Sequence, residues 1–255
     1  MIELYNSPSS TCSQKVRLSL AEKGIEFVDR RVNTHANEHL QPEYLKLNPN
    51  GVVPTLVHDG NVICDSSVIC EYLEDVFPTP SLVPVAPVER AHLRAWLRFV
   101  EEVPTPAIRV PSFHLALVQL YANLDEERFR TQEADARPLR KHFYHRMGLE
   151  GFSKAEVAVA LEELGLTLRR MEERLEKKGP WLFGDDLSIA DIVVTPTIDR
   201  MNDLGLSFMW EQKYPQVSNW YEQWKGRPSF DATYYPGSRL SERMKLKTLD
   251  LSETC

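Results

Sequence analysis

The sequence has few of the features that would place the protein in a membrane, outside the cell or on a nucleic acid. It has 255 residues and a net charge of −7 at pH 7, so no basic excess is available to bind nucleic acid or anionic lipid. No apolar run approaches the ~18 residues that a membrane span needs, and residues 1–5 enter an expected strand instead of a signal segment. We therefore expect a cytoplasmic protein that binds neither membrane nor nucleic acid.

Cysteine is also scarce. No two cysteines have C-x-x-C or zinc-site spacing, and so few in a chain of this length do not make a disulfide scaffold. His142 and His145 lack a third ligand at a suitable spacing, so we expect no metal site. We expect reduced thiols, with Cys64 and Cys70 as apolar fillers and no evident role for Cys255. The four cysteines are Cys12, Cys64, Cys70 and Cys255.

The first third of the chain has the pattern of a small α/β unit. Apolar periodicity predicts a strand at 2–5, a helix at 13–23 and a strand at 25–32. Two short apolar runs flank Asp59-Gly60, a strong hairpin signal, and a helix is expected at 66–76. The order is strand-helix-strand, then strand-strand-helix, which predicts a four-stranded sheet.

The remainder of the chain predicts helices only. Prolines at 78, 80, 84 and 87 favour a boundary, because proline interrupts helices and central strands. Helical spacing is clearest at 154–178, with further helices at 91–103 and 215–226, and the tail after Tyr235 is polar and expected to be partly ordered. Ser188 and Asp191 form a variant capping box, so we assign Asp191 to folding and not to chemistry.

The stretch 48–67 carries a family resemblance. Its Asn-Pro-x-Gly-x-Val-Pro-x-Leu and Asp-Ser-x-x-Ile segments resemble the glutathione-binding half of cytosolic glutathione S-transferases, and Gly-x-x-x-Ser-x-Ala-Asp at 184–191 resembles their helical half. The resemblance implies an α/β thioredoxin-like N-terminal domain at 1–78, a linker at 79–87 and an all-α domain at 88–255. It also implies a homodimer that uses glutathione as co-substrate.

The same resemblance implies the residues that bind glutathione. The bond before Pro54 is expected to be cis, and Val53 is expected to pair its backbone with the cysteinyl part of glutathione, like an added strand. Asp65 and Ser66 match the residues that bind the γ-glutamyl end, and both also fit a helix cap. His39 matches a histidine that binds the glycine carboxylate.

Only a thiolate attacks an electrophile, so the site needs donors near the sulfur. The end of the first strand and the start of the first helix supply them at residues 9–13, where the helix dipole also helps. By resemblance, Ser10 is the first choice for the catalytic residue, Cys12 the second and Ser13 the third. Each serine has an alternative role as a helix cap. The remaining donors of this loop are Ser9 and Thr11.

A narrower likeness concerns the substrate. The block 68–78, the chain length and the charged insertion 125–150, with Phe143 and Tyr144, are similar to bacterial glutathione-dependent β-aryl etherases, which cleave lignin-type ethers. This likeness implies a hydrophobic, aromatic electrophile in the cleft between the domains. Two alternatives stay open: an enzyme of disulfide exchange or deglutathionylation that uses Cys12, and a binding protein without catalysis.

Overall fold

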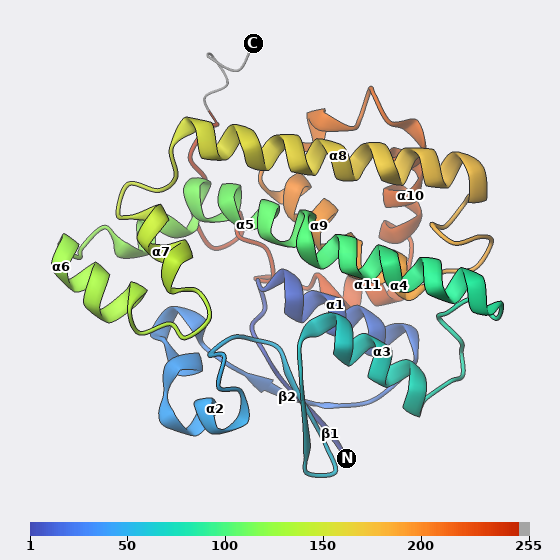
Figure 1. Ribbon diagram of the computed structural model, residues 1–255, viewed down its shortest axis with the longest axis horizontal. Helices are drawn as coiled ribbons and strands as arrows, with labels where there is room; N and C mark the ends of the chain where they lie inside the picture. Colours follow the sequence, from blue (N-terminus) through green and yellow to red (C-terminus); the bar gives the residue numbers. More distant parts are fainter. Residues whose placement is uncertain (250–255) are drawn as a thin grey trace.

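The computed structural model describes residues 1–249, and its N-terminal part is built on a mixed four-stranded sheet (Figure 1). The strand order is β2-β1-β3-β4. Strand β1 pairs parallel with β2 and antiparallel with β3, and β3 pairs antiparallel with β4. The strands are β1 (Ile2–Asn6), β2 (Val28–Arg31), β3 (Thr55–His58) and β4 (Asn61–Cys64).

Helices α1 (Thr11–Glu22) and α3 (Ser66–Val76) join the sheet to the rest of the molecule. In Figure 1 they lie between the sheet and the helices of the second half. Because the helices are covered on both faces, side chains of this layer are fully buried: Leu18 and Ile69 of the helices, and Leu4 and Leu56 of the sheet. Shorter helices follow β2: η1 (Thr34–Ala36), η2 (Glu38–Leu40) and α2 (Pro42–Leu47).

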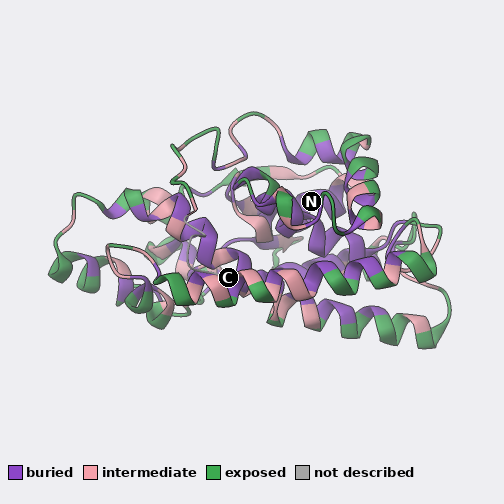
Figure 2. Ribbon diagram, turned by 90° about the horizontal axis from the view of Figure 1, so that it is seen from above, coloured by how far each residue is buried: buried purple, intermediate pink, exposed green. Residues whose placement is uncertain are grey.

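The second half of the described chain is helical and packs around α9, which is buried along almost its whole length. Figure 2 shows the buried residues gathered in the interior and the exposed residues on the outer faces of the helices. Helix α9 contacts α1, α4 and α5, so the helical core and the sheet layer form one continuous apolar interior. No described helix is long and apolar enough to cross a bilayer. The elements are α4 (Pro87–Glu102), α5 (Pro104–Leu115), η3 (Leu117–Tyr121), α6 (Glu126–Arg128), the π-helix η4 (Phe129–Ala134), α7 (Lys141–Met147), α8 (Lys154–Lys178), α9 (Ile189–Asp203), η5 (Ser207–Met209), α10 (Pro215–Lys225) and α11 (Pro228–Thr233).

This architecture confirms the predicted fold class, a thioredoxin-like α/β half followed by a helical half. The Val53–Pro54 bond is cis, as the resemblance implies, and α8 has the predicted bounds. The second strand is shorter than predicted. The N–H of Ile25 donates to the Leu20 carbonyl at 2.9 Å, so the chain is still closing the end of α1 where a strand was expected.

A partly ordered tail is predicted after Tyr235, and its described residues, 236–249, are held against the helical half. Leu240 is buried and its N–H donates to Asp203 at 2.8 Å, while the N–H of Lys247 donates to the Leu115 carbonyl at 2.8 Å. The polar composition suggested disorder, but these polar groups bond to buried carboxylates and carbonyls of the helical half. Cys255 lies outside the described residues.

The capping prediction for Asp191 is confirmed. Asp191 is fully buried, and its carboxylate accepts from the Ser188 N–H at 3.0 Å and the Ser188 hydroxyl at 2.8 Å. It also accepts from the N–H of Leu182 and the indole of Trp220, both at 2.9 Å. One carboxylate therefore fixes the start of α9, the loop before it and α10.

Replacing Asp191 with alanine should destabilise the whole fold. Asp191→Ala leaves four buried donors without an acceptor, so the free energy of unfolding should fall by about 3–5 kcal/mol. Urea denaturation followed by circular dichroism measures this change. Asp186→Ala is the matched control, because Asp186 is an exposed residue of the same loop and its loss should be close to neutral. A loss for Asp191→Ala no larger than the control would contradict the capping role.

Candidate functional site

The loop between β1 and α1 presents a helix N-terminus to a cavity. Ser10 is the N-cap of α1, and its hydroxyl accepts from the Ser13 N–H at 3.3 Å. The free N–H groups of the first turn and the helix dipole favour an anion at this point. Cys12 lies in the same turn and is half-buried.

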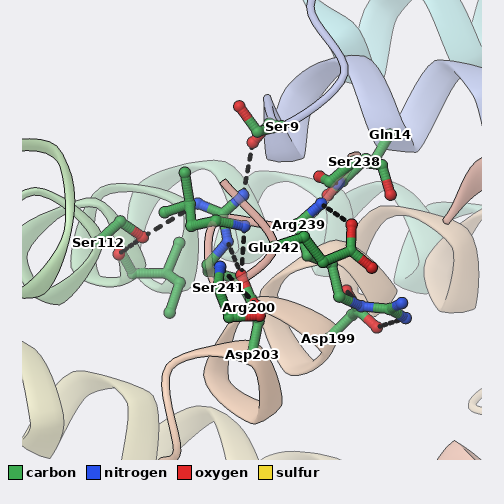
Figure 3. Close-up of polar contacts among 12 residues, drawn as sticks. Ser9, Gln14, Ser112, Asp199, Arg200, Asp203, Ser238, Arg239, Ser241 and Glu242 are labelled. Atoms are coloured by element: carbon green, nitrogen blue, oxygen red, sulfur yellow. Dashed lines mark hydrogen bonds and ion pairs between the residues drawn. The ribbon is translucent and has the colours of Figure 1, made fainter. Parts of the chain in front are cut away.

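Two buried arginines hold the carbonyl groups of this loop. Arg17 donates to the Pro8 carbonyl at 2.8 Å and to the Ser7 carbonyl at 3.3 Å. Arg200 of α9 donates to the Ser9 carbonyl, as the dashed line in Figure 3 shows. Three successive carbonyls are thus bonded to guanidinium groups, which fixes the loop in one conformation.

Arg200 is itself held by the helical half. It is almost fully buried, lies 3.5 Å from the Asp203 carboxylate and donates to the Ser112 hydroxyl at 3.3 Å (Figure 3). Asp203 also accepts from the N–H groups of Leu240 and Ser241, at 2.8 and 3.2 Å. The C-terminal segment therefore supports the loop through two side chains of α9.

The cavity has a volume of about 340 Å³ and is lined by both halves of the chain. Of the predicted residues, six line it: Ser9, Ser10, Thr11, Cys12, His39 and Val53. Four do not: Ser13, Pro54, Asp65 and Ser66. The Ser13 hydroxyl is fully buried and accepts from the Ser7 N–H at 3.3 Å. Asp65 caps α3 by accepting from the N–H groups of Ser67 and Val68.

Two cations, Arg109 and Lys15, interact electrostatically with Cys12. Burial, followed by the nearby charge of Arg140, lowers the pKa of Arg109 to about 10, and Cys12 acts in the opposite sense on it. Burial lowers the pKa of Lys15, but the Glu101 carboxylate and then Cys12 raise it by more, so the pKa of Lys15 is raised overall. Lys15 forms an ion pair with Glu101 at 2.6 Å. A thiolate in this turn would therefore have two cations beside it, despite the acidic balance of the chain.

His39 lines the cavity with an unpartnered ring nitrogen. It is 8% exposed, and its Nδ1 has no hydrogen-bond partner. Burial first, and then the charges of Arg137 and Arg140, lower the pKa of His39 to about 4. His39 is therefore neutral at physiological pH and lies where the protein charge is positive.

Sequence reasoning missed the arginines of the site, because their partners are far away in the chain. Arg109, Arg137, Arg140 and Arg200 all line the cavity, and none was predicted. A signal was present for Arg200, which is the single basic residue of a helix that is buried along almost its whole length. In the insertion 125–150, Tyr144 lines the cavity, whereas His142 and His145 are exposed and do not.

Comparisons with known proteins match one family over most of the chain. Sequence profiles for the glutathione S-transferase N-terminal and C-terminal domains match residues 9–76 and 148–223. The chain is 30% identical to a probable maleylacetoacetate isomerase of Caenorhabditis elegans, with 91% of this chain and 92% of that protein covered. It is 28% identical to the protein LigF of Sphingobium sp. strain SYK-6, with 93% and 95% covered. The crystal structure of β-etherase LigF matches with a TM-score of 0.80 at 29% identity, covering 91% of this chain and 98% of that one.

The low pKa of His39 predicts an acid-sensitive fold. Unfolding returns the imidazole to a pKa of about 6.5, so the unfolded chain binds the proton more readily than the folded one between pH 6.5 and about 4. Protonation of His39 therefore does not reduce the free energy of unfolding above pH 6.5. The free energy of unfolding falls as the pH decreases from 6.5 towards 4, because the unfolded chain takes up the proton first. His39→Gln should remove about 1–3 kcal/mol of this loss.

Urea denaturation at a series of pH values measures the effect of His39→Gln. His142→Gln is the matched control, because His142 is exposed on α7. Identical pH dependence for wild type and His39→Gln would contradict a buried neutral imidazole.

Proposed function

Because this chain belongs to the glutathione S-transferase family, we propose that it cleaves β-aryl ethers that carry an adjacent ketone, the bond type found in lignin, with glutathione thiolate as the nucleophile. The observation that carries the proposal is the likeness to the β-etherase LigF along almost the whole of both chains. A cavity that runs from the polar loop 9–12 to an aromatic wall supports it further.

Glutathione would lie along the N-terminal half as an extended peptide. The N–H of Val53 has no partner among the hydrogen bonds of the described residues, so it is available to an added strand. Asp65 has a φ of 74°, a strained value for a residue other than glycine, and such strain is concentrated at functional sites. Asp65 and Ser66 would bind the γ-glutamyl end at the start of α3, next to the cis bond of Pro54, and His39 would bind near the glycine end.

The thiolate of glutathione would form at the start of α1. Ser10, Thr11 and Cys12 line the cavity and are half-buried, which supports them as groups facing the sulfur. The positions of Ser10 and Ser13 favour Ser10, because the Ser13 hydroxyl is turned inward to the Ser7 N–H. Ser9 contributes through its backbone, which Arg200 holds.

The ether would occupy the part of the cavity lined by the helical half. Phe113, Leu117, Tyr121 and Tyr144 give this part an apolar and aromatic surface. The Tyr121 hydroxyl donates to the Tyr144 hydroxyl at 3.5 Å, which leaves the proton of Tyr144 free to donate to a ketone. The thiolate attacks the β-carbon in line, a carbon–sulfur bond forms, and the carbon–oxygen bond breaks. Phenoxide leaves and takes a proton from water, so no oxidant or reductant is needed.

A second candidate function rests on Cys12, which lines the cavity beside two cations. The Cys12 thiolate would attack a glutathione mixed disulfide, release the substrate thiol and retain glutathione as a protein mixed disulfide. A second glutathione thiolate would then free Cys12 and leave as glutathione disulfide.

We also propose the limits of the two domains and the assembly of the protein. We infer domains at 1–78 and 88–255 with a linker at 79–87, and a cytoplasmic homodimer. Exposed apolar side chains on β4 and α3 support a protein interface there: Val62, Val68 and Val76.

Incubation with a β-aryloxy ketone and glutathione tests the proposal. Chromatography should detect free phenol and a β-glutathionyl ketone in equal amounts, with inverted configuration at the β-carbon. Ser10→Ala should lower kcat by about 10–100-fold, as expected for loss of one donor to a developing or bound anion. Ser13→Ala is the matched comparison and should lower kcat less.

Cys12→Ser separates the two candidate functions. Under the ether-cleavage proposal it keeps phenol release, whereas a Cys12 enzyme loses turnover of glutathione mixed disulfides. Absence of phenol together with ready conjugation of chlorodinitrobenzene would refute ether cleavage and leave a general transferase.

A further inference from the structure

The segment 133–140 of the helical half lies directly on the N-terminal half. In Figure 1 this part of the chain, between η4 and α7, lies beside the loops that follow β2. The Asn37 side chain donates to Glu133 at 3.0 Å and accepts from Arg137 at 3.0 Å. Arg137 and Glu133 form an ion pair at 2.8 Å. Both polar ends of the Asn37 amide are thus bonded to one charged pair.

A second contact brings the same segment against the loop that leads to Val53. Gly51 lines the cavity and has a φ of +58°. A Cβ at this position would lie 2.9 Å from Leu40 Cδ2 and 3.2 Å from Pro138 Cδ. Only glycine therefore allows Pro138 to approach this closely. Together with the Asn37 contact, this packing makes residues 133–140 a roof over one end of the cavity.

Positive charge is concentrated under this roof. Among residues 1–249, the lining of the cavity contains four arginines and a single acidic side chain, Glu133, which already pairs with Arg137. Arg137 is 4% exposed, stacks on the Tyr144 ring at 4.0 Å, and its Nε has no hydrogen-bond partner. The Nδ1 of the neighbouring His39 is also buried without a partner. Buried polar groups are normally satisfied, so the Nδ1 of His39 is available to a ligand in the cavity.

Arg140 is the free cation of this group. It lines the cavity, is half-buried, and no ion pair or side-chain hydrogen bond is found for it among residues 1–249. It lines the same cavity as His39, which follows β2, and Arg109 of α5. A planar guanidinium without a partner fits a carboxylate by paired N–H···O bonds.

We propose that the roof formed by residues 133–140 binds the glycine carboxylate of glutathione, with Arg140 as a direct ligand beside His39 and Arg137 as the residue that holds the roof in place. This inference rests on the proposed use of glutathione and extends it, because it assigns part of the glutathione site to the helical half. A carboxylate is costly to bury unless it is paired, and here it meets two cations and an imidazole. The roof makes the protein specific for the complete tripeptide.

The consequence is discrimination between glutathione and γ-glutamylcysteine, which lacks the glycine residue. Isothermal titration calorimetry with the full-length protein should give a dissociation constant for γ-glutamylcysteine that is roughly 10–100-fold weaker than for glutathione. Arg140→Ala should weaken glutathione binding by a similar factor and leave γ-glutamylcysteine binding unchanged, so that the variant no longer discriminates. In kinetics, the KM for glutathione should rise while kcat stays the same.

Arg130→Ala is the matched control, because Arg130 is an exposed arginine of η4, just before the roof, and its loss should change neither affinity. Arg140→Gln keeps the side-chain volume and serves as a second variant if Arg140→Ala does not fold. Equal weakening of both ligands, or no weakening of either, would overturn the inference. Phenol release tests the proposed function separately. If the wild-type protein releases phenol but binds glutathione and γ-glutamylcysteine equally well, only the role of the roof is refuted. If it prefers glutathione but releases no phenol, only ether cleavage is refuted.

Discussion

The bond from Arg200 to the Ser9 carbonyl is the contact on which the site depends. It joins the centre of the helical core to the loop that precedes α1, and it is formed by a guanidinium that is almost fully buried. A buried charge of this kind is stable only when it is paired, and Asp203 supplies the partner. Because Asp203 also accepts from the C-terminal segment, the loop, α9 and the chain end form one connected network.

This network explains how an acidic protein can hold an anionic peptide. The chain has a net charge of −7, yet the described part of the chain lines the cavity with four arginines and one carboxylate. Arg200 and Arg17 occupy the loop carbonyls with hydrogen bonds, and the hydroxyl-bearing residues Ser10 and Thr11 at the helix start line the cavity. Arg109 and Lys15 place positive charge near the expected sulfur, and the roof places it near the expected glycine carboxylate. Local geometry therefore overrides the overall charge.

The sequence predicted those parts of the fold that depend on neighbours in the chain. The helix 154–178 follows from apolar spacing with a stop at Gly179, and the Ser188–Asp191 cap needs only four consecutive residues. The second strand was overextended, because the turn after α1 uses Ile25. Contacts between residues distant in the chain could not be predicted, because no local pattern indicates that Arg137 donates to Asn37 or that Arg200 donates to the Ser9 carbonyl. For the same reason no local pattern indicates that the segment after Tyr235 bonds to Asp203 of α9.

The central claim is that the start of α1, held by Arg200, stabilises glutathione as a thiolate. The most direct measurement is the pKa of the bound thiol, obtained from the ultraviolet absorbance of the thiolate during a pH titration of the complex. A Cys12→Ser background removes the signal of the protein thiol in the same turn. We predict that bound glutathione titrates at least about one pH unit below the ~8.5 of a free thiol. A bound thiol that titrates at the same pH as free glutathione would contradict the account.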